Sequence, residues 1–331
     1  MDINNLYNQI SKIIESNNSF VIITHNYPDG DSLGSQIALY QLMVSLKKNV
    51  VAVCNSELPY QYKFLPHFNK IRKDFNEIKN SGKKYICFCL DCADENRMNL
   101  DFKEIKDNFE YIINMDHHNK NTNFGDLNVV DLQKSATAEI LYELICKFYR
   151  ELLDSIIATG IYVGILTDTG QFQYSNTNHA VHKVVSDLLR FNLNPSEINK
   201  HIYENEPLER FKLIQLIFQR IEYVASTGLI YSYALLRDFK KLNLPFSAQD
   251  GIINLMRTAE KARIVALIKQ TEKRCFKISL RTSDSRVDLS KIAGKFNGGG
   301  HRMASAYSDN GSLRIVINNL KKTVKDCISY E

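Results

Sequence analysis

Short apolar runs without alternation recur along the first half of the chain, and each is rich in β-branched or aromatic residues. Such runs are typical of strands covered on both faces, as in a parallel sheet. Segments with helical periodicity lie between and around them. The expected strands are Phe20–Thr24, Val50–Cys54, Tyr85–Leu90 and Tyr111–Met115, and the expected helices are Ile3–Glu15, Ser32–Leu46, Ala136–Tyr149 and Ala180–Phe191. This alternation predicts a doubly wound α/β domain, with a mainly parallel sheet and helices on both faces.

The pattern changes after Pro195, where a long charged stretch with helical character, Pro207–Tyr223, is followed by a second set of strands. These strands are expected at Leu229–Leu235, Arg263–Lys269 and Phe276–Leu280. A chain of 331 residues exceeds the usual span of one domain, so two domains are expected. We predict a first domain over 1–195, a helical connector over 196–224 and a smaller C-terminal α/β domain over 225–331.

Composition limits the classes of function. The 42 basic and 37 acidic residues give a net charge of only +5, which suits a small anionic ligand better than long nucleic acid. No apolar stretch is long enough to span a membrane and the N-terminus is polar, so we expect a soluble, cytoplasmic protein without membrane contact. Three of the seven cysteines lie close together at one strand end: Cys87, Cys89 and Cys92. We expect them to be reduced thiols packed in a core rather than a metal-binding or redox motif.

Candidate chemistry gathers in four short segments of the first domain: His25–Asp31, Asp91–Asp94, Asp116–His118 and Thr167–Thr169. Each follows an apolar run typical of a buried strand, the last run being Ile161–Leu166. Parallel strands bring their carboxyl ends to one edge of a sheet, where ligands bind. The four segments are therefore predicted to meet and form a site for two divalent metal ions, since carboxylates and imidazoles suit Mn²⁺, Mg²⁺ or Zn²⁺.

Each segment alone has a simpler explanation. The carboxylates in His25–Asp31 could cap the helix that starts near Ser32, and a lone Asp168 in a turn is usually structural. Asp91 ends an otherwise apolar strand, where a carboxylate is costly to bury without a cation or several donors. The combination of all four segments favours the metal site.

Further candidates could contact an anionic substrate. The segment Gly298-Gly299-Gly300-His301 would let the backbone approach a phosphate closely. A flexible loop that only connects two elements would show the same glycine-rich pattern. Arg281, at the end of a strand, is a candidate that the family resemblance described below supports, although an arginine at a strand end is more often just solvated. Arg97 is a weaker candidate of the same kind.

Together these motifs resemble the DHH phosphoesterase superfamily. The order HNYPDGDSLGS, LDCAD, DHH and TDTG is similar to the metal domain of that superfamily, and GGGHRMASA is similar to its associated C-terminal substrate domain. The resemblance covers nearly the whole chain. One departure is Gln173, which stands where related sequences often carry arginine.

The resemblance implies a ligand set for two Mn²⁺ ions, with Mg²⁺ or Co²⁺ as alternatives. One ion would be held by His25, Asp29 and Asp91, and the other by Asp31, Asp91, His117 and Asp168. Asp91 would bridge the ions, and His118 would contact the scissile phosphate. In the second domain the resemblance implies that the segment from Gly298 to His301 holds the nucleotide portion of the substrate and that Arg281 reaches the substrate phosphate.

The implied activity is hydrolysis of cyclic di-AMP, linear pApA or very short single-stranded RNA to mononucleotides by a water that two metal ions activate. Alternatives are a pAp 3′-phosphatase, an inorganic pyrophosphatase and a RecJ-like single-strand exonuclease. A dinucleotide sensor is the alternative that is not an enzyme, but the filled ligand positions favour catalysis. The expected partner is a small nucleotide or dinucleotide. The sequence does not determine the oligomeric state, and a homodimer is possible.

Overall fold

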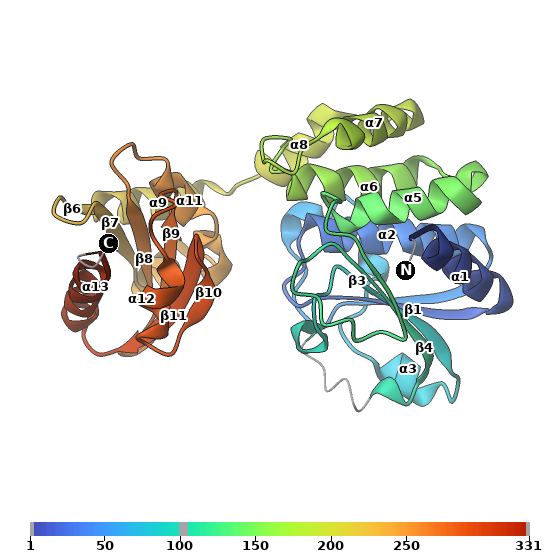
Figure 1. Cartoon of the computed structure of the whole chain (residues 1–331), viewed down its shortest axis with the longest axis horizontal. Helices are drawn as coiled ribbons and strands as arrows, with labels where there is room; N and C mark the ends of the chain where they lie inside the picture. Colours follow the sequence, from blue (N-terminus) through green and yellow to red (C-terminus); the bar gives the residue numbers. More distant parts are fainter. Residues whose placement is uncertain (1–2, 99–104, 329–331) are drawn as a thin grey trace. The chain divides into compact units, whose positions relative to one another are not determined.

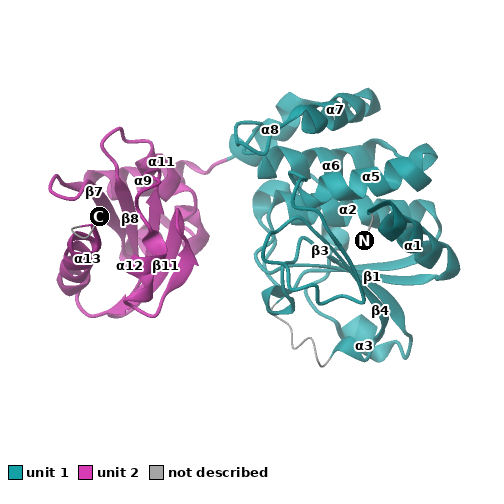
Figure 2. Cartoon of the chain, in the orientation of Figure 1, with its two compact units in different colours: residues 1–205 teal, residues 206–331 magenta. Residues whose placement is uncertain are grey.

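The computed structural model describes residues 3–98 and 105–328, so the outermost residues of the predicted domains lie outside it. The chain divides into two compact units, residues 1–205 and 206–331 (Figure 2). The division falls between helix α8 (Pro195–Tyr203) and helix α9 (Leu208–Gln219), inside the segment predicted as a connector. Each unit therefore contains one helix of that segment.

The first unit is built on a five-stranded sheet in the order β2-β1-β3-β4-β5, and every pair of neighbouring strands is parallel. The strands are β1 (Ser19–Thr24), β2 (Asn49–Val53), β3 (Tyr85–Leu90), β4 (Phe109–Asp116) and β5 (Leu127–Val130). The four expected strands are present, and β5 is an addition. The predicted fold class, a parallel α/β sheet followed by a smaller α/β domain, is confirmed.

Alternate residues of the strands enter two different cores, because successive side chains point to opposite faces of a sheet. Phe20 and Phe88 pack under the helices on one face, whereas Val21 and Cys87 face a second core that includes Ile78 of α3. The helices of this unit are α1 (Ile3–Ser16), α2 (Gly30–Ser45), α3 (Asn76–Asn80), α5 (Thr137–Phe148), α6 (Ser155–Asp168), α7 (His179–Leu188) and α8. Figure 1 shows β1, β3 and β4 of this sheet, with α2, α5 and α6 on one side of them. Both faces of the sheet are thus covered.

The three clustered cysteines belong to the second of these cores. Cys87, Cys89 and Cys92 are fully buried free thiols. Burial raises the pKa of Cys92, which keeps its thiol protonated and weakly reactive. Their role is packing against the sheet, as the sequence favoured.

The expectation that Asp168 follows a buried strand is wrong. Ile161–Leu166 lies inside helix α6, whose last residue is Asp168. This helix is buried on nearly every side, so its apolar residues form an unbroken run without helical periodicity. A run of that kind cannot be told from a buried strand by its pattern alone.

Helices α2 and α6 cross at very short range because glycines line the contact. A Cβ atom on Gly34 would lie 2.2 Å from the carbonyl oxygen of Gly160, and a Cβ on Gly164 would lie 2.7 Å from Oδ1 of Asp31. Only glycine leaves room for such an approach of two backbones. The crossing brings Asp31 of α2 next to the helix that ends at Asp168.

The second unit contains a six-stranded mixed sheet in the order β10-β11-β9-β8-β7-β6. Its strands are β6 (Glu222–Val224), β7 (Leu229–Ala234), β8 (Ile264–Glu272), β9 (Cys275–Thr282), β10 (Gly299–His301) and β11 (Ala304–Asn310). Its helices are α9, α10 (Leu236–Leu242), α11 (Ile252–Arg257), α12 (Leu289–Gly294) and α13 (Leu313–Ile328). Helices α12 and α13 pack on one face of the sheet, and α9, α10 and α11 contribute to a core on the other.

Within the described part of the chain, no helix combines the length and the apolar character that crossing a membrane requires.

Candidate metal centre

The four predicted segments meet in the first unit, and their side chains form overlapping groups. Nε2 of His25 lies 3.5 Å from Oδ2 of Asp91 and 3.9 Å from Oδ2 of Asp29. Nε2 of His117 lies 3.1 Å from Oδ2 of Asp168, 3.6 Å from Oδ1 of Asp91 and 3.8 Å from Oδ2 of Asp31. Asp91 thus presents one carboxylate oxygen to each histidine, as a bridging ligand would.

These groups have the composition and the spacing of metal sites. His25, Asp29 and Asp91 can place one ligand atom each within 4.8 Å of one another, and so can Asp31, His117 and Asp168. A third such group joins Asp91, His117 and His118. Nitrogen and carboxylate oxygen donors in these numbers suit a pair of divalent cations and leave positions for other ligands.

Local sequence explains why Asp29 and Asp31 lie side by side. Asp29 is the N-cap of α2, where its Oδ1 accepts hydrogen bonds from the backbone N–H groups of Asp31 and Ser32. One carboxylate oxygen is used in the cap, and Oδ2 faces His25. Asp29 therefore caps helix α2 with one carboxylate oxygen and faces the metal cluster with the other.

The start of helix α5 holds Asp31, a contact that the sequence analysis did not anticipate. The backbone N–H groups of Thr137 and Ala138 donate to Asp31 at 2.6 and 2.9 Å, and the Thr137 hydroxyl donates to Oδ1 of Asp91 at 3.2 Å. Free N–H groups and the helix dipole favour an anion at a helix N-terminus. The available signal was Thr137 itself, a polar residue at the start of an expected helix.

Asp91 sits in a strained backbone conformation. Its φ is +57°, a left-handed value that costs energy for a residue with a side chain. The backbone N–H of Asp91 donates to the Met115 carbonyl at 2.9 Å, which ties the end of β3 to the end of β4. The strain is therefore held by the sheet and directs this carboxylate into the cluster.

The cluster carries more negative charge than its surroundings balance. Asp31 and Asp91 are 0% and 1% exposed, and no lysine or arginine forms an ion pair with them among the residues that the structure describes. Burial first, and then the charge of Asp168, raises the pKa of Asp31 to about 7. Burial and the charge of Asp31 raise the pKa of Asp91 well above its usual range. Such carboxylates require a compensating cation to be ionised.

His117 supplies a direct test of whether a metal fits. Its Nε2 is buried and makes no hydrogen bond, although three carboxylates surround it. Burial alone would lower the pKa of His117, but Asp168 and Asp31 outweigh it and raise that pKa to about 9. In the metal-free chain a proton on His117 balances part of the charge of these carboxylates, and a divalent cation that displaced it would find one nitrogen and several carboxylate oxygens as ligands.

Hydrogen bonds on the far side of the rings orient the other two histidines. Nδ1 of His25 lies 2.7 Å from the Asn26 carbonyl oxygen, which can only accept, so Nδ1 carries the proton and Nε2 keeps its lone pair for the cluster. Nδ1 of His118 lies 2.7 Å from Oδ1 of Asp116. Asp116 is fully buried, and the sequence motif alone does not reveal its role.

Only one of the predicted substrate residues belongs to the same unit as the cluster. Arg97 lies in a short 3-10 helix (Glu95–Met98) with an exposed side chain, and its carbonyl accepts a hydrogen bond from Asn26 N–H at 2.7 Å. It therefore lies beside the loop that carries His25. Arg281 is on β9 of the second unit, where its guanidinium donates to the Leu280 carbonyl.

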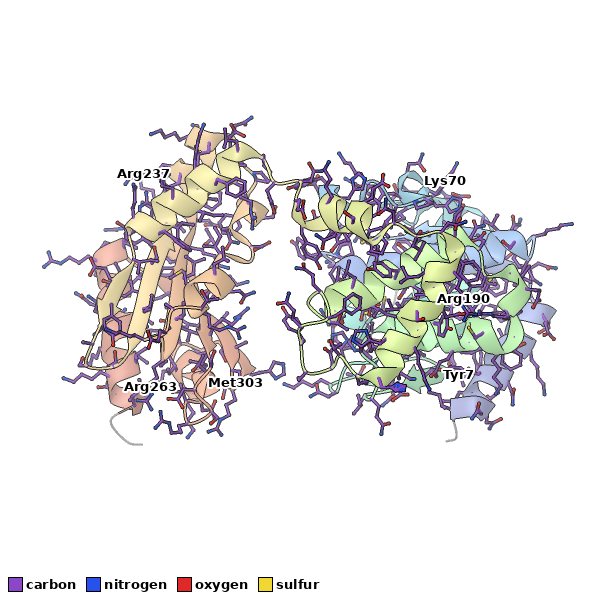
Figure 3. The ribbon with its side chains drawn as sticks, turned by 90° about the horizontal axis from the view of Figure 1, so that it is seen from above. Tyr7, Lys70, Arg190, Arg237, Arg263 and Met303 are labelled. Atoms are coloured by element: carbon purple, nitrogen blue, oxygen red, sulfur yellow. The ribbon has the colours of Figure 1, made fainter. Side chains whose placement is uncertain are left out.

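The glycine segment is an edge strand rather than a loop. Gly299–His301 forms β10 and pairs with β11, and the exposed Met303 lies at the turn between them (Figure 3). Cβ atoms on Gly298 or Gly300 would lie 2.4 and 2.6 Å from β11. Packing against β11 therefore requires two of the glycines, while Gly299 has open space around it.

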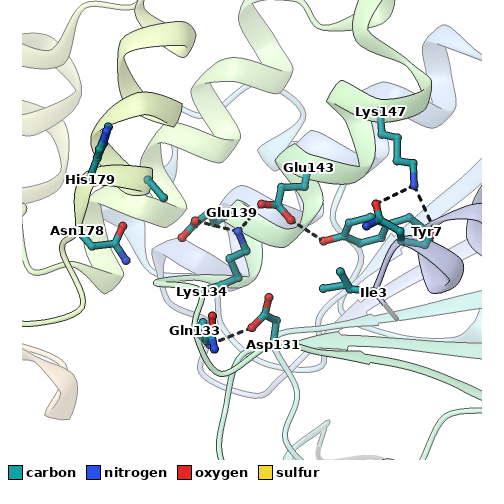
Figure 4. Close-up of a pocket in the computed structure, with 12 residues that line it drawn as sticks. Ile3, Tyr7, Asp131, Gln133, Lys134, Glu139, Glu143, Lys147, Asn178 and His179 are labelled. Carbon is teal, nitrogen blue, oxygen red and sulfur yellow. Dashed lines mark hydrogen bonds and ion pairs between the residues drawn. The ribbon is translucent and has the colours of Figure 1, made fainter. Parts of the chain in front are cut away.

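A cavity of about 670 Å³ lies elsewhere in the first unit and includes no residue of the metal cluster (Figure 4). Lys134 crosses it to form ion pairs with Glu139 and Glu143, and Tyr7 donates to Glu143. Glu139 in turn accepts from the backbone N–H of Ser135 at 2.9 Å. This network fixes the segment that leads into α5, and so supports the N–H groups that hold Asp31.

Comparison with known proteins decides the family. Residues 19–165 match the family model described as "DHH family, N-terminal domain", and residues 227–329 match the one described as "DHHA1 domain". A Thermus thermophilus relative, the bifunctional oligoribonuclease and PAP phosphatase NrnA, is 30% identical over 295 residues, which cover 88% of this chain and 84% of the relative. The chain belongs to the DHH family. The family resemblance of the motifs is confirmed, and the DHH-family chain is a metal-dependent phosphoesterase.

Two further comparisons extend over almost the whole DHH-family chain. A Bacillus subtilis relative, also named bifunctional oligoribonuclease and PAP phosphatase NrnA, is 25% identical over 304 residues and covers 91% of this chain and 92% of its own. The crystal structure of an exopolyphosphatase-related protein from Bacteroides fragilis has a TM-score of 0.89 at 22% identity, covering 98% of this chain and 96% of that one. The second likeness establishes a shared fold.

Proposed function

We propose that this DHH-family protein is a Mn²⁺-dependent phosphodiesterase that cleaves very small nucleotides, namely pApA, very short RNA or cyclic di-AMP, to mononucleotides. The observation that carries the proposal is the position of Asp91, whose two carboxylate oxygens face His25 and His117 separately. One ion would be held by His25, Asp29 and Asp91, and a second by Asp31, Asp91, His117 and Asp168. Mg²⁺ or Co²⁺ could take the same ligands.

Two divalent ions supply a nucleophile at neutral pH and neutralise charge on phosphoryl oxygens. The residues of the chain perform the remaining tasks. Thr137 and Ala138 hold Asp31 through backbone N–H groups, and Thr137 holds Asp91 through its hydroxyl. His118 is 38% exposed at its side chain and its Nδ1 is held by Asp116, so Nε2 is the ring nitrogen left to contact the scissile phosphate.

A second candidate activity, removal of the 3′-phosphate from pAp, is supported by the curated relatives. Both the Thermus and the Bacillus proteins carry names that combine oligoribonuclease with PAP phosphatase. The two reactions break the same kind of phosphorus–oxygen bond, so one metal centre could serve both. We propose Arg97 from the first unit, with Arg281 and the residues Gly298, Gly299, Gly300 and His301 from the second, as contacts for the nucleotide.

A parallel assay tests the proposal. The protein is given pApA, cyclic di-AMP, a short RNA, pAp and pyrophosphate with Mn²⁺, Mg²⁺ or Co²⁺ in turn, and kcat/KM is compared, because selectivity is a ratio of such values. We expect nucleotides to be cleaved and Mn²⁺ to give the highest rates. A clear preference for pyrophosphate, or binding of dinucleotides without turnover, would overturn the proposal.

A further inference from the structure

The buried amide of Asn114 lies between two strands whose ends carry residues of the metal cluster. Asn114 is on β4, where it pairs with Cys89 of β3, and it is 0% exposed. Its Nδ2 lies 3.4 Å from the Cys89 carbonyl oxygen and 3.0 Å from the Cys92 carbonyl oxygen. A carbonyl oxygen can only accept a hydrogen bond, so the amide nitrogen of Asn114 donates to both.

The two carbonyls stand on either side of Asp91, the residue with the left-handed backbone. The φ of Asp91 is +57°, and its own N–H donates to the Met115 carbonyl at 2.9 Å. A conformation of this kind persists only where the surrounding structure fixes it. Asn114 and its neighbour Met115 therefore hold the backbone before, at and after Asp91 from one position of β4.

A second amide extends this contact to the residue that holds His118. Oδ1 of Asn114 accepts a hydrogen bond from Nδ2 of Asn121 at 2.8 Å. The same nitrogen lies 2.6 Å from Oδ2 of Asp116 and 3.3 Å from the Cys92 carbonyl oxygen. Both N–H groups and the oxygen of the Asn114 amide are thus used, which satisfies a polar group buried in the sheet.

We propose that Asn114 is a positioning residue of the metal centre, which holds the strained backbone at Asp91 so that each carboxylate oxygen of Asp91 faces one histidine. The inference rests on the proposed function, because it concerns the ligand that two ions would share. Without the Asn114 amide, the Cys89 and Cys92 carbonyls lose a buried donor and the backbone between them can relax. A shifted Asp91 carboxylate would weaken the binding of both ions, because it would contact both.

Binding of Mn²⁺ to the full chain, without nucleotide, tests the proposal apart from catalysis. Asn114→Leu keeps a side chain of similar size and removes both donors and the acceptor. We expect the dissociation constant for Mn²⁺ to rise about 10- to 100-fold for both ions, the range found when residues that orient metal ligands are replaced. A titration followed by the electron paramagnetic resonance signal of free Mn²⁺ gives the affinity and the number of ions bound.

Gln36→Leu is the matched control. Gln36 is also 0% exposed, and its Nε2 donates to the Ile22 and Val53 carbonyls at 2.9 and 3.0 Å. The substitution therefore removes two donors to backbone carbonyls of the same sheet, but neither carbonyl adjoins Asp91. It should lower the midpoint of denaturant unfolding about as much as Asn114→Leu does, and its affinity for Mn²⁺ should equal that of the unmodified protein.

Unchanged Mn²⁺ affinity in Asn114→Leu, or a loss limited to one ion, would overturn the proposal. An equal loss of affinity in both variants would assign Asn114 a purely structural role and overturn it too. Asn114→Ala and Gln36→Ala provide the same comparison if a leucine variant does not fold. An unmodified protein that binds Mn²⁺ but cleaves no nucleotide would refute only the proposed activity, whereas one that binds no Mn²⁺ would overturn both.

Discussion

Asp116 and His118 form a buried-to-surface pair at the end of β4, with Oδ1 of Asp116 accepting a hydrogen bond from Nδ1 of His118 at 2.7 Å. The other carboxylate oxygen of Asp116 accepts from the Asn121 side chain at 2.6 Å. Burial opposes the ionisation of Asp116, but the hydrogen bonds from His118 and Asn121 outweigh it and hold its pKa below the usual value. An ionised Asp116 fixes the ring of His118 and keeps the proton on Nδ1.

Replacing Asp116 with asparagine should slow turnover without removing metal. The asparagine has one acceptor oxygen for two donors, so the ring of His118 loses its fixed orientation and the charge beside it. We expect kcat to fall about 10- to 100-fold, the range found for residues that orient others in metal sites. Metal content measured by mass spectrometry should stay normal. In a His118→Ala background the same change should cost almost nothing further, and additive losses would contradict the pairing.

Asp91 and His118 should fail in different ways. Asp91→Ala removes the carboxylate shared by both ligand groups, so the protein should lose both ions and its activity. His118→Ala leaves the ligand groups around His25 and Asp31 intact and should keep metal while turnover falls. Metal content and kcat measured on both variants test the distinction. An Asp91→Ala protein that is active and loaded with metal would refute the bridging role.

The parallel sheet could be predicted because its strands are short, apolar and β-branched, and the end of such a strand is a known place for ligands. His25 and Asp91 follow directly from that rule. Asp168 does not follow from it, because it ends a helix that is buried on nearly all sides. The sequence of such a helix has the same unbroken apolar pattern as a buried strand. Its place in the cluster depends on the α2–α6 crossing, which only the glycine contacts of the folded chain reveal.

Contacts between groups far apart along the chain could not be predicted from the sequence. The N–H groups of Thr137 and Ala138 reach Asp31 across more than a hundred residues, and no side-chain pattern records a backbone donor. Asp116 belongs to the Asp116–His118 motif, but its role depends on which ring nitrogen of His118 faces it. Asn114 belongs to an expected strand, and only the folded chain places its amide beside the carbonyls on either side of Asp91.

The glycine contact between α2 and α6 can be tested with Gly34→Ala. A helical alanine is usually favourable, but this Cβ would meet the Gly160 carbonyl oxygen at 2.2 Å. We expect the free energy of unfolding to fall by about 1–3 kcal/mol, as in other overpacked contacts, and activity to fall because Asp31 moves relative to Asp168. Denaturant unfolding and kcat provide the measurements.

Gly294→Ala is the matched control for that substitution. Gly294 also lies in a helix, α12, and has no atom within 4 Å of a new Cβ. Its replacement should leave stability unchanged or raise it by up to about 1 kcal/mol. Equal effects of the two substitutions would show that the α2–α6 contact tolerates a methyl group.

The pH dependence of the metal-free protein follows from two raised pKa values. Asp31 has a pKa of about 7 in the folded chain against 3.8 ordinarily, and His117 has about 9 against 6.5. The folded state binds these protons more tightly, so their stabilisation is complete at low pH and is lost as pH rises through 7 and then 9. In EDTA, the amount by which these two groups raise the Tm should therefore decrease between about pH 5.5 and 8.5.

Divalent metal should reverse this trend, because it binds the deprotonated ligands and replaces the lost protons. The difference in Tm between Mn²⁺-loaded and EDTA-treated protein should grow from about pH 5.5 to 8.5. Asp31→Asn removes one of the two groups, so it should flatten the pH dependence in EDTA and shrink the gain from Mn²⁺. Thermal unfolding of both proteins at the two pH values provides the measurement. A gain from Mn²⁺ that stays constant with pH, or that Asp31→Asn leaves untouched, would mean that these carboxylates do not exchange protons for metal.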